Sequence, residues 1–260
     1  QMSNTIVSNM LRTVCVSSEG YVYSFGYCFQ GSHGHEGEIY LPTRIPSLKN
    51  IKSVVGSDHT VCLDYDGNVY TFGSNRYGEL GIDVDNETLC FTHIPQKVNV
   101  PPCKEIYCGV FFTICLSNDG SVYSFGHNLN GEIGNGTHGD PVPSPQNVPT
   151  LKNVEFIECG GSYVFCKTSN NEVYCWGFNQ YGQLGLGHTD KQYSPVICSD
   201  LLTEDVIEIK CGHTHTLVLT SNGDVLSCGS NVYGQLGRET DNSSFQKIEN
   251  LSEIIRIECG

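Results

Sequence analysis

The chain has 260 residues, of which 38% are hydrophobic, so it is long enough to bury a sizeable core. Its 14 Lys and Arg residues against 28 Asp and Glu residues give a formal net charge of −14, which disfavours direct binding to nucleic acid or to anionic lipid. No apolar run approaches the roughly 20 residues of a membrane-spanning helix, so we expect no insertion into a membrane.

A glycine that follows Phe, Trp or Cys recurs along the chain at intervals of 47, 53, 51 and 52 residues. These anchor glycines are Gly26, Gly73, Gly126, Gly177 and Gly229. Each is followed five and eight residues later by two more glycines, as in Gly182 and Gly185 after Gly177. A period of about 50 residues predicts a repeat architecture such as a propeller or solenoid.

The third unit shows the predicted elements of one repeat in chain order. Short apolar runs near 106–107 and 113–116 predict two strands, and Asp119-Gly120 predicts a tight turn. Residues 122–125 alternate large with small side chains, which predicts a third strand, and 146–148 mark a fourth. In the fourth unit Asn171 stands in the column of Gly120, which supports a turn with positive φ because Asn tolerates that conformation best after Gly. We therefore expect an all-β chain with four strands per repeat.

Three segments carry a resemblance to a known family: residues 70–81 (YTFGSNRYGELG), 176–187 (WGFNQYGQLGLG) and 211–217 (CGHTHTL). They resemble the repeat of the regulator-of-chromosome-condensation family, and the resemblance covers essentially the whole chain. It implies a β-propeller of four-stranded blades, and the family usually closes seven. We expect residues 1–260 to be a single repeat domain of five units, part of a seven-bladed ring in a longer chain; an unusual smaller ring is the alternative.

Eight of the 14 cysteines fall in two repeat columns, which other copies fill with Ser or Val. A column that accepts any small side chain predicts packing rather than disulfide or metal chemistry. This favours a reducing compartment, the cytosol or the nucleus. Four Asn-X-Ser/Thr triplets, beginning at Asn86, Asn135, Asn242 and Asn250, point weakly the other way.

No group of residues predicts catalysis, a cofactor or a metal. His59 and His215 share a column with Arg12, Phe112 and Tyr163, so we expect a buried histidine here to bond the backbone of a neighbouring blade. The segment His33-Gly34-His35-Glu36 comes nearest to a metal site, but the sequence does not indicate a further ligand that would complete one. The Gly-rich stretches recur once per unit, which is typical of turns and not of a phosphate-binding loop.

The segment 9 to 14 residues past each anchor is rich in acids. It contains nine carboxylates against Lys191 and Arg238, half of the net charge of the chain. The candidate protein-binding residues are Glu36, Glu38, Asp83, Asp85, Glu87, Asp140, Asp190, Glu239 and Asp241. Because equivalent loops of a repeat emerge at equivalent places, we expect a negative surface that attracts a basic partner, or, alternatively, ordinary solvated loops.

These observations predict a non-catalytic protein-interaction propeller without a cofactor, binding a protein partner through its inter-strand loops. The resemblance implies an alternative, a guanine-nucleotide exchange factor for a Ran-like or other small GTPase. The founding exchange factor adds a basic N-terminal tail and a wedge-like blade insertion. Here the repeat spacing stays between 47 and 53 residues, so the five units contain no such insertion, and no basic tail is present. Either feature could belong to blades outside these five, so the exchange hypothesis is weakened and not excluded.

Overall fold

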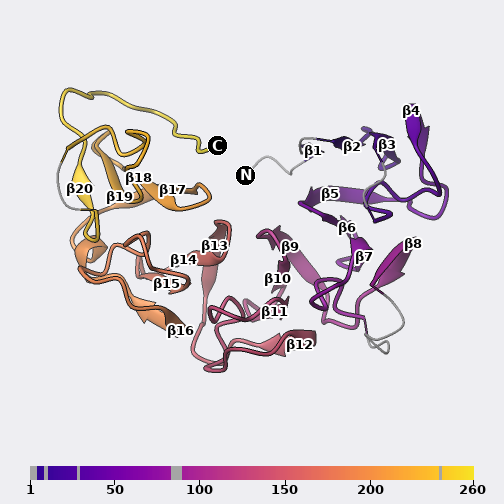
Figure 1. Cartoon of the computed structure of the whole chain (residues 1–260), viewed down its shortest axis with the longest axis horizontal. Coiled ribbons are helices and arrows are strands. Elements are labelled where there is room, and N and C mark those ends of the chain that lie inside the picture. The colour runs from indigo at the N-terminus through magenta and orange to yellow at the C-terminus, as the bar shows by residue number, and fades with distance from the viewer. Residues whose placement is uncertain (1–4, 9–10, 28–29, 83–89, 240–241) are drawn as a thin grey trace. The chain divides into compact units, whose positions relative to one another are not determined.

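The computed structural model describes residues 5–8, 11–27, 30–82, 90–239 and 242–260. The described residues form twenty β-strands and one 3-10 turn, and the strands lie in five four-stranded antiparallel sheets (Figure 1). Within each sheet every strand pairs with the next strand along the chain, so each sheet is an up-and-down blade. The predicted all-β class, with one four-stranded blade per repeat, is confirmed.

The strand bounds follow the repeat. Blade 1 holds β1 (Ile6–Ser8), β2 (Arg12–Val16), β3 (Val22–Gly26) and β4 (Ile39–Arg44). Blade 2 holds β5 (Ile51–Gly56), β6 (His59–Asp64), β7 (Val69–Ser74) and β8 (Phe91–Lys97). Blade 3 holds β9 (Cys103–Cys108), β10 (Phe112–Ser117), β11 (Val122–Gly126) and β12 (Val142–Asn147). Blade 4 holds β13 (Val154–Cys159), β14 (Tyr163–Thr168), β15 (Val173–Gly177) and β16 (Gln192–Ile197). The turn η1 (Ser199–Leu201) precedes blade 5, which holds β17 (Val206–Cys211), β18 (His215–Thr220), β19 (Val225–Gly229) and β20 (Gln246–Lys247).

The glycine columns have two different physical causes. The turn between the second and third strands needs a positive φ, and Asn171 adopts φ 65° there, as the sequence predicts. The anchor Gly177 ends β15 with φ 101°, and a Cβ at this position would lie 2.6 Å from the Ser162 carbonyl oxygen. The anchor therefore excludes side chains by close backbone approach as well as by conformation.

The chain divides into two compact units, each described by itself. Unit 1 comprises residues 1–128 and 140–149, and unit 2 comprises residues 129–139 and 150–260. In unit 1, Val14 of blade 1 and Phe72 of blade 2 belong to one buried cluster. In unit 2, Phe165 of blade 4 and Val218 of blade 5 share another. The hydrophobic core thus lies between neighbouring blades, so a blade completes its core only beside another blade.

A repeated hydrogen bond joins three pairs of neighbouring blades. The acceptor is the backbone carbonyl six residues past an anchor, and the donor is a threonine hydroxyl on the second strand of the next blade. The three pairs are Thr60 to Ser32 (2.7 Å), Thr113 to Glu79 (2.9 Å) and Thr216 to Gln183 (2.8 Å). We call this contact the seam hydrogen bond. It satisfies a buried carbonyl that no strand ladder reaches.

Blade 4 makes the seam hydrogen bond differently. Val164 occupies the threonine column and has no hydroxyl. The indole Nε1 of Trp176 donates instead to the Glu132 carbonyl, at 2.9 Å. Gly134 lies so close to this indole that a Cβ there would be 2.8 Å from Nε1. The single tryptophan therefore replaces the missing hydroxyl and fills the seam of unit 2 with a fully buried side chain.

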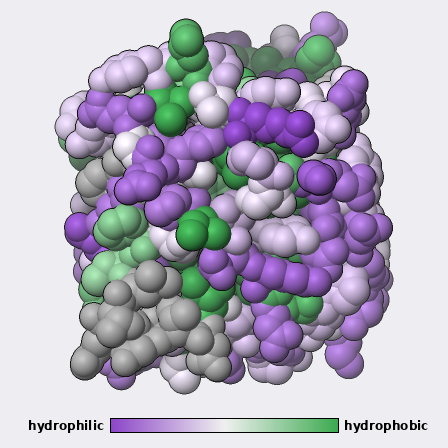
Figure 2. All heavy atoms as spheres, turned by 90° about the vertical axis from the view of Figure 1, so that its right-hand side faces the viewer, coloured by the Kyte–Doolittle hydropathy of each residue, from purple (hydrophilic) through white to green (hydrophobic). Residues whose placement is uncertain are grey.

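The fourth strands are the exposed edges of the blades. Four of the five contain proline, which cannot donate a ladder hydrogen bond: Pro42, Pro95, Pro143 with Pro145, and Pro195. The fifth, β20, has only two residues. Figure 2 shows one side of the molecule, where apolar residues form separate spots among hydrophilic ones. Short or proline-containing edges limit pairing with another chain.

Across the part of the chain that the structure describes, no helix has the length and apolar character needed to cross a membrane.

Candidate protein-interaction surface

The five predicted site residues that the structure describes lie in the long loops that join the third and fourth strands. The long loops are residues 27–38, 75–90, 127–141, 178–191 and 230–245. In blade 4, Gly177 pairs with Tyr163 on one side and with Gln192 on the other. The long loop therefore emerges at the same end of the blade as the short turn between the first two strands. The turn between the second and third strands lies at the opposite end.

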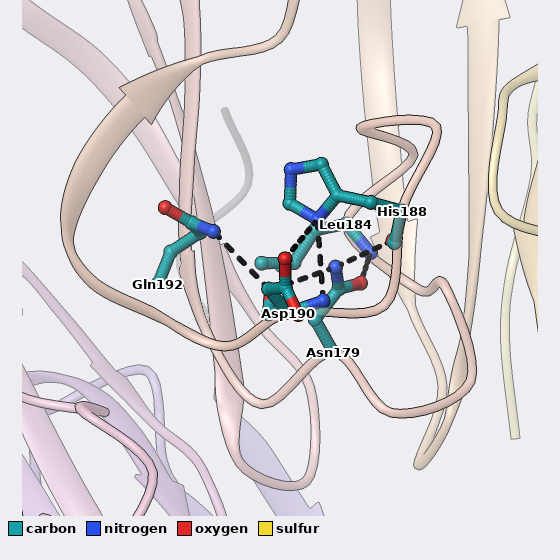
Figure 3. A network of polar contacts seen from close by, with 5 residues as sticks. All are labelled: Asn179, Leu184, His188, Asp190 and Gln192. Carbon is teal, nitrogen blue, oxygen red and sulfur yellow. Dashed lines mark hydrogen bonds and ion pairs between the residues drawn. The ribbon is translucent and has the colours of Figure 1, made fainter.

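The long loop of blade 4 is held from within by Asn179 (Figure 3). The Asn179 side-chain oxygen accepts the Leu184 N–H at 2.9 Å, and its Nδ2 donates to the carbonyls of His188 (2.9 Å) and Asp190 (3.1 Å). Gln192 Nε2 donates to the same Asp190 carbonyl at 3.2 Å. One buried amide thus ties the beginning of the loop to its acidic end, which fixes where the Asp190 backbone lies.

Other blades repeat this arrangement with equivalent residues. In blade 5, Asn231 accepts the Leu236 N–H at 3.0 Å and donates to the Arg238 carbonyl at 2.6 Å. In blade 2, Asn75 accepts the Leu80 N–H at 3.2 Å. The Asn two residues past the anchor and the Leu seven past it are therefore loop-closing residues, which explains why the repeat retains them.

The structure exposes a set of apolar side chains in the long loops that sequence reasoning missed. Tyr181 is 48% exposed, and Tyr233, its equivalent in blade 5, is 92% exposed beside the exposed Val232. The Phe178 and Tyr181 rings meet edge-on with centroids 5.9 Å apart. The signal available in the sequence is the column four residues past the anchor, where Tyr77, Tyr181 and Tyr233 recur.

The five predicted acids that the structure describes are all exposed. They are Glu36, Glu38 and Asp140 in unit 1, and Asp190 and Glu239 in unit 2. The Asp190 side chain is 88% exposed, and its carboxylate lies 3.9 Å from His188 Nδ1. Glu38 accepts a hydrogen bond from the Tyr40 hydroxyl. Asp83, Asp85, Glu87 and Asp241 lie outside the described residues.

The two cations of this segment are engaged with their own chain. The Arg238 guanidinium donates to the Ser227 carbonyl at 2.8 Å and to the Ser227 hydroxyl at 3.1 Å, so it turns inward. The Lys191 ammonium lies 5.8 Å from the centroid of the Phe178 ring. The long loops of unit 2 therefore present carboxylates to solvent while their own cations contact the blade.

The column of His59 joins blades rather than forming a site. His59 Nε2 lies 2.8 Å from the Thr113 hydroxyl, so the ring contacts the next blade as expected, but through a side chain and not through the backbone. Burial lowers the pKa of His59 to about 3, which keeps the ring neutral. Arg12 in the same column donates to the Ser57 (2.6 Å) and His59 (2.9 Å) carbonyls of blade 2.

The cysteines and the His33 segment are held by packing and by local bonds. Burial raises the pKa of the Cys62 and Cys108 thiols to about 12, which makes them poor nucleophiles. His33 Nε2 contacts the Gly37 carbonyl at 2.7 Å, and its Nδ1 accepts the His35 N–H at 3.2 Å. Among the described residues, no three His, Cys, Asp or Glu side chains gather as metal ligands would.

The family model described as the RCC1-like domain matches residues 5–260, which include all five blades. The chain belongs to the RCC1-like domain family. The predicted resemblance is confirmed. Two of the segments that carried it, 70–81 and 176–187, contain the loop-closing residues described above.

Curated relatives share this RCC1-like domain within longer proteins. The human E3 ubiquitin-protein ligase HERC2 is 34% identical in an alignment of 260 residues that covers 95% of this chain and 5% of the ligase. The ultraviolet-B receptor UVR8 of Arabidopsis thaliana is 30% identical in an alignment of 246 residues that covers 90% of this chain and 55% of the receptor. The chain thus spans only a small part of the ligase and about half of the receptor.

Solved structures confirm the propeller fold of the RCC1-like domain. Prp20p from Saccharomyces cerevisiae, whose crystal structure was reported with its binding to Gsp1p and histones, matches with a TM-score of 0.83 and 20% identity over 97% of this chain and 66% of that one. Human WBSCR16 matches with a TM-score of 0.81 and 21% identity over 98% of this chain and 70% of that one. At this level of identity the likeness concerns the fold alone.

Proposed function

We propose that this RCC1-like domain is a non-catalytic binding module that takes a basic surface of another protein at its long loops. The observation that carries the proposal is the charge arrangement in unit 2. Asp190 and Glu239 are exposed, whereas Lys191 and Arg238 of the same loops contact their own chain. A negative surface that its own cations leave uncovered favours and orients a positive partner.

The relatives agree with a binding role. Prp20p, which shares the fold, is reported to bind Gsp1p and histones. The matching part of HERC2 is 5% of that ligase, so the shared domain is a small module within it. We extend the proposal to a reducing compartment, the cytosol or the nucleus, because the buried thiols of the blades pack as ordinary small side chains.

The test is the binding of the 260-residue chain to a panel of basic proteins that includes core histones, measured at several salt concentrations. Reversing the charges with Asp190→Lys and Glu239→Lys should weaken binding about tenfold and flatten its salt dependence. The matched control is Asp66→Lys, an exposed acid in the turn at the opposite end of blade 2. Unchanged affinity and salt dependence in the double variant would remove the proposal.

A second candidate function is guanine-nucleotide exchange on a small GTPase. It is favoured by the TM-score of 0.83 to Prp20p, which is reported to bind Gsp1p. The experiment is nucleotide release from a panel of small GTPases, including the nuclear-transport type. Accelerated release would make the chain an exchange factor. No acceleration by the folded chain leaves the binding module as the proposal.

A further inference from the structure

Tyr181 and Tyr233 are exposed aromatic side chains on rigid backbone. Each occupies the position four residues past its anchor, and each N–H donates to the side-chain oxygen of the Gln two residues later. These distances are 3.1 Å to Gln183 and 2.9 Å to Gln235. The backbone is therefore fixed while the ring stands in solvent, 48% exposed in blade 4 and 92% in blade 5. A tyrosine on a fixed backbone has only two side-chain torsions left to order, so it loses little conformational entropy when a partner covers it.

Each of these tyrosines shares its loop with an exposed carboxylate, and internal bonds fix the backbone at or next to that acid. Asn179, two residues before Tyr181, donates to the Asp190 carbonyl (Figure 3). Asn231, two residues before Tyr233, donates to the carbonyl of Arg238, and Glu239 follows directly. The aromatic segment and the acidic segment of each loop are therefore joined by one asparagine, in two neighbouring blades of unit 2.

An aromatic ring and a carboxylate presented by the same loop suit one kind of side chain better than others. A guanidinium is planar and weakly hydrated, so it can stack on a tyrosine ring and still pair with a carboxylate through its N–H groups. An ammonium is a compact, strongly hydrated charge and gains less from the ring. The loop's own guanidinium, that of Arg238, bonds to Ser227 inside the blade and leaves the ring to a partner.

We propose that the long loops of blades 4 and 5 bind arginine side chains of a protein partner, with Tyr181 and Tyr233 stacking on the guanidinium groups and Asp190 and Glu239 pairing with them. The inference rests on the proposed function, because it names the chemistry by which the same loops recognise a basic partner. It adds that the partner supplies arginine, and that lysine at equal charge is the poorer ligand.

The experiment uses two peptide probes of equal charge, an octapeptide of alternating Arg and Gly and one of alternating Lys and Gly. Their binding to the 260-residue chain is measured by calorimetry at low salt. The arginine peptide should bind about fivefold more tightly than the lysine peptide, the order of magnitude for one to two stacked cations. The double variant Tyr181→Leu, Tyr233→Leu should lose this preference and keep its affinity for the lysine peptide.

The matched control is Tyr65→Leu. Tyr65 is 65% exposed between Asp64 and Asp66, but it lies in the turn at the opposite end of blade 2. This variant should keep the full preference for arginine. Unfolding curves check that all variants are folded. We expect them to be, because substitutions at exposed positions change stability little.

Two outcomes would overturn the inference in different ways. Equal affinity for both peptides, or a preference that survives in the double tyrosine variant, overturns the arginine inference and leaves the basic-partner proposal standing. If neither peptide binds at low salt, both the arginine inference and the basic-partner proposal are removed.

Discussion

The base and the tip of the long loop in blade 4 are a few residues apart in sequence and have opposite environments. At the base, Asn179 and Leu184 are buried and bond to each other. At the tip, Tyr181 and Asp190 are exposed. The base residues recur in blades 2, 4 and 5, which form the same loop-closing bonds, whereas the exposed acids Asp190 and Glu239 stand at different distances from their anchors. The difference indicates that the repeat motif holds the blade together and that recognition depends on the side chains between the motif positions.

The largest expected effect is at the seam behind the loop base. Trp176→Ala should lower the free energy of unfolding by about 3–5 kcal/mol, because it removes a fully buried indole and leaves a cavity. Tyr181→Ala at the tip should change it by less than about 0.5 kcal/mol. Urea denaturation of both variants measures the two changes in the free energy of unfolding. Similar changes at the two positions would contradict the difference between base and tip.

Removal of the base amide comes next. Asn179→Ala should cost about 1–3 kcal/mol, because the Leu184 N–H and the carbonyls of His188 and Asp190 lose a partner. Gln192→Ala, which removes one exposed bond to the same Asp190 carbonyl, should cost well under 1 kcal/mol. Hydrogen exchange of the Leu184 amide should accelerate only in the first variant. Equal protection in both would show that Asn179 does not hold the loop.

The seam between blades 2 and 3 should weaken in acid. Burial lowers the pKa of His59 to about 3, while the unfolded chain takes up a proton near pH 6.5. The stability due to neutral His59 is therefore complete above pH 6.5 and is lost as the pH falls toward 3. Between pH 6.5 and 5 the loss should be about 1.5–2 kcal/mol. His59→Gln should lack this slope; an equal slope in both proteins would contradict a buried neutral ring.

The hydrogen bond of the tryptophan can be separated from its volume. Trp176→Phe leaves the Glu132 carbonyl without the indole donor. Adding Val164→Thr restores the hydroxyl that the other seams use and should recover about 1 kcal/mol. In the unmodified background Val164→Thr should give no such gain, because the indole already serves the carbonyl. If a double-mutant cycle finds no coupling between positions 164 and 176, the indole does not replace the threonine hydroxyl as donor to the Glu132 carbonyl.

The smallest effect on stability is expected at the acidic tip. Asp190→Asn with Glu239→Gln should change the free energy of unfolding by less than about 0.5 kcal/mol, since both side chains are exposed. The same variant should bind a basic protein more weakly. A loss of stability above about 1 kcal/mol in urea denaturation would show that these acids help to hold the loop, as the buried base residues do.

Much of the fold could be predicted from the sequence, because glycine spacing reports backbone geometry directly. Asn171 in a glycine column predicts its positive φ, and the Asp119-Gly120 turn predicts the hairpin of β10 and β11. The tyrosine surface could not be predicted in this way. A tyrosine in a repeat can be core or surface: Tyr163 is fully buried and Tyr233 is almost fully exposed. Only the position of each relative to the anchor and to the next blade separates them.

The sequence also could not predict that the Trp176 indole replaces the threonine hydroxyl as hydrogen-bond donor in the seam of blade 4. Val164, Trp176 and Glu132 lie in different columns of two repeats, and nothing in their spacing shows that they share one hydrogen bond. For the acids, the sequence placed the described ones correctly in exposed loops. Whether they act together on one partner depends on a partner that sequence patterns do not reveal.

The seam contacts have a consequence for how the chain acquires its structure. Thr216 is 33 residues from Gln183, Trp176 is 44 from Glu132, and Tyr163 is 52 from His215, so each contact closes a chain segment of about one repeat or less. The entropy cost of closing such segments stays nearly constant along the chain. A blade emerging during synthesis needs only the blade before it as a template. Assembly can therefore advance one blade at a time from the N-terminus, without waiting for distant residues.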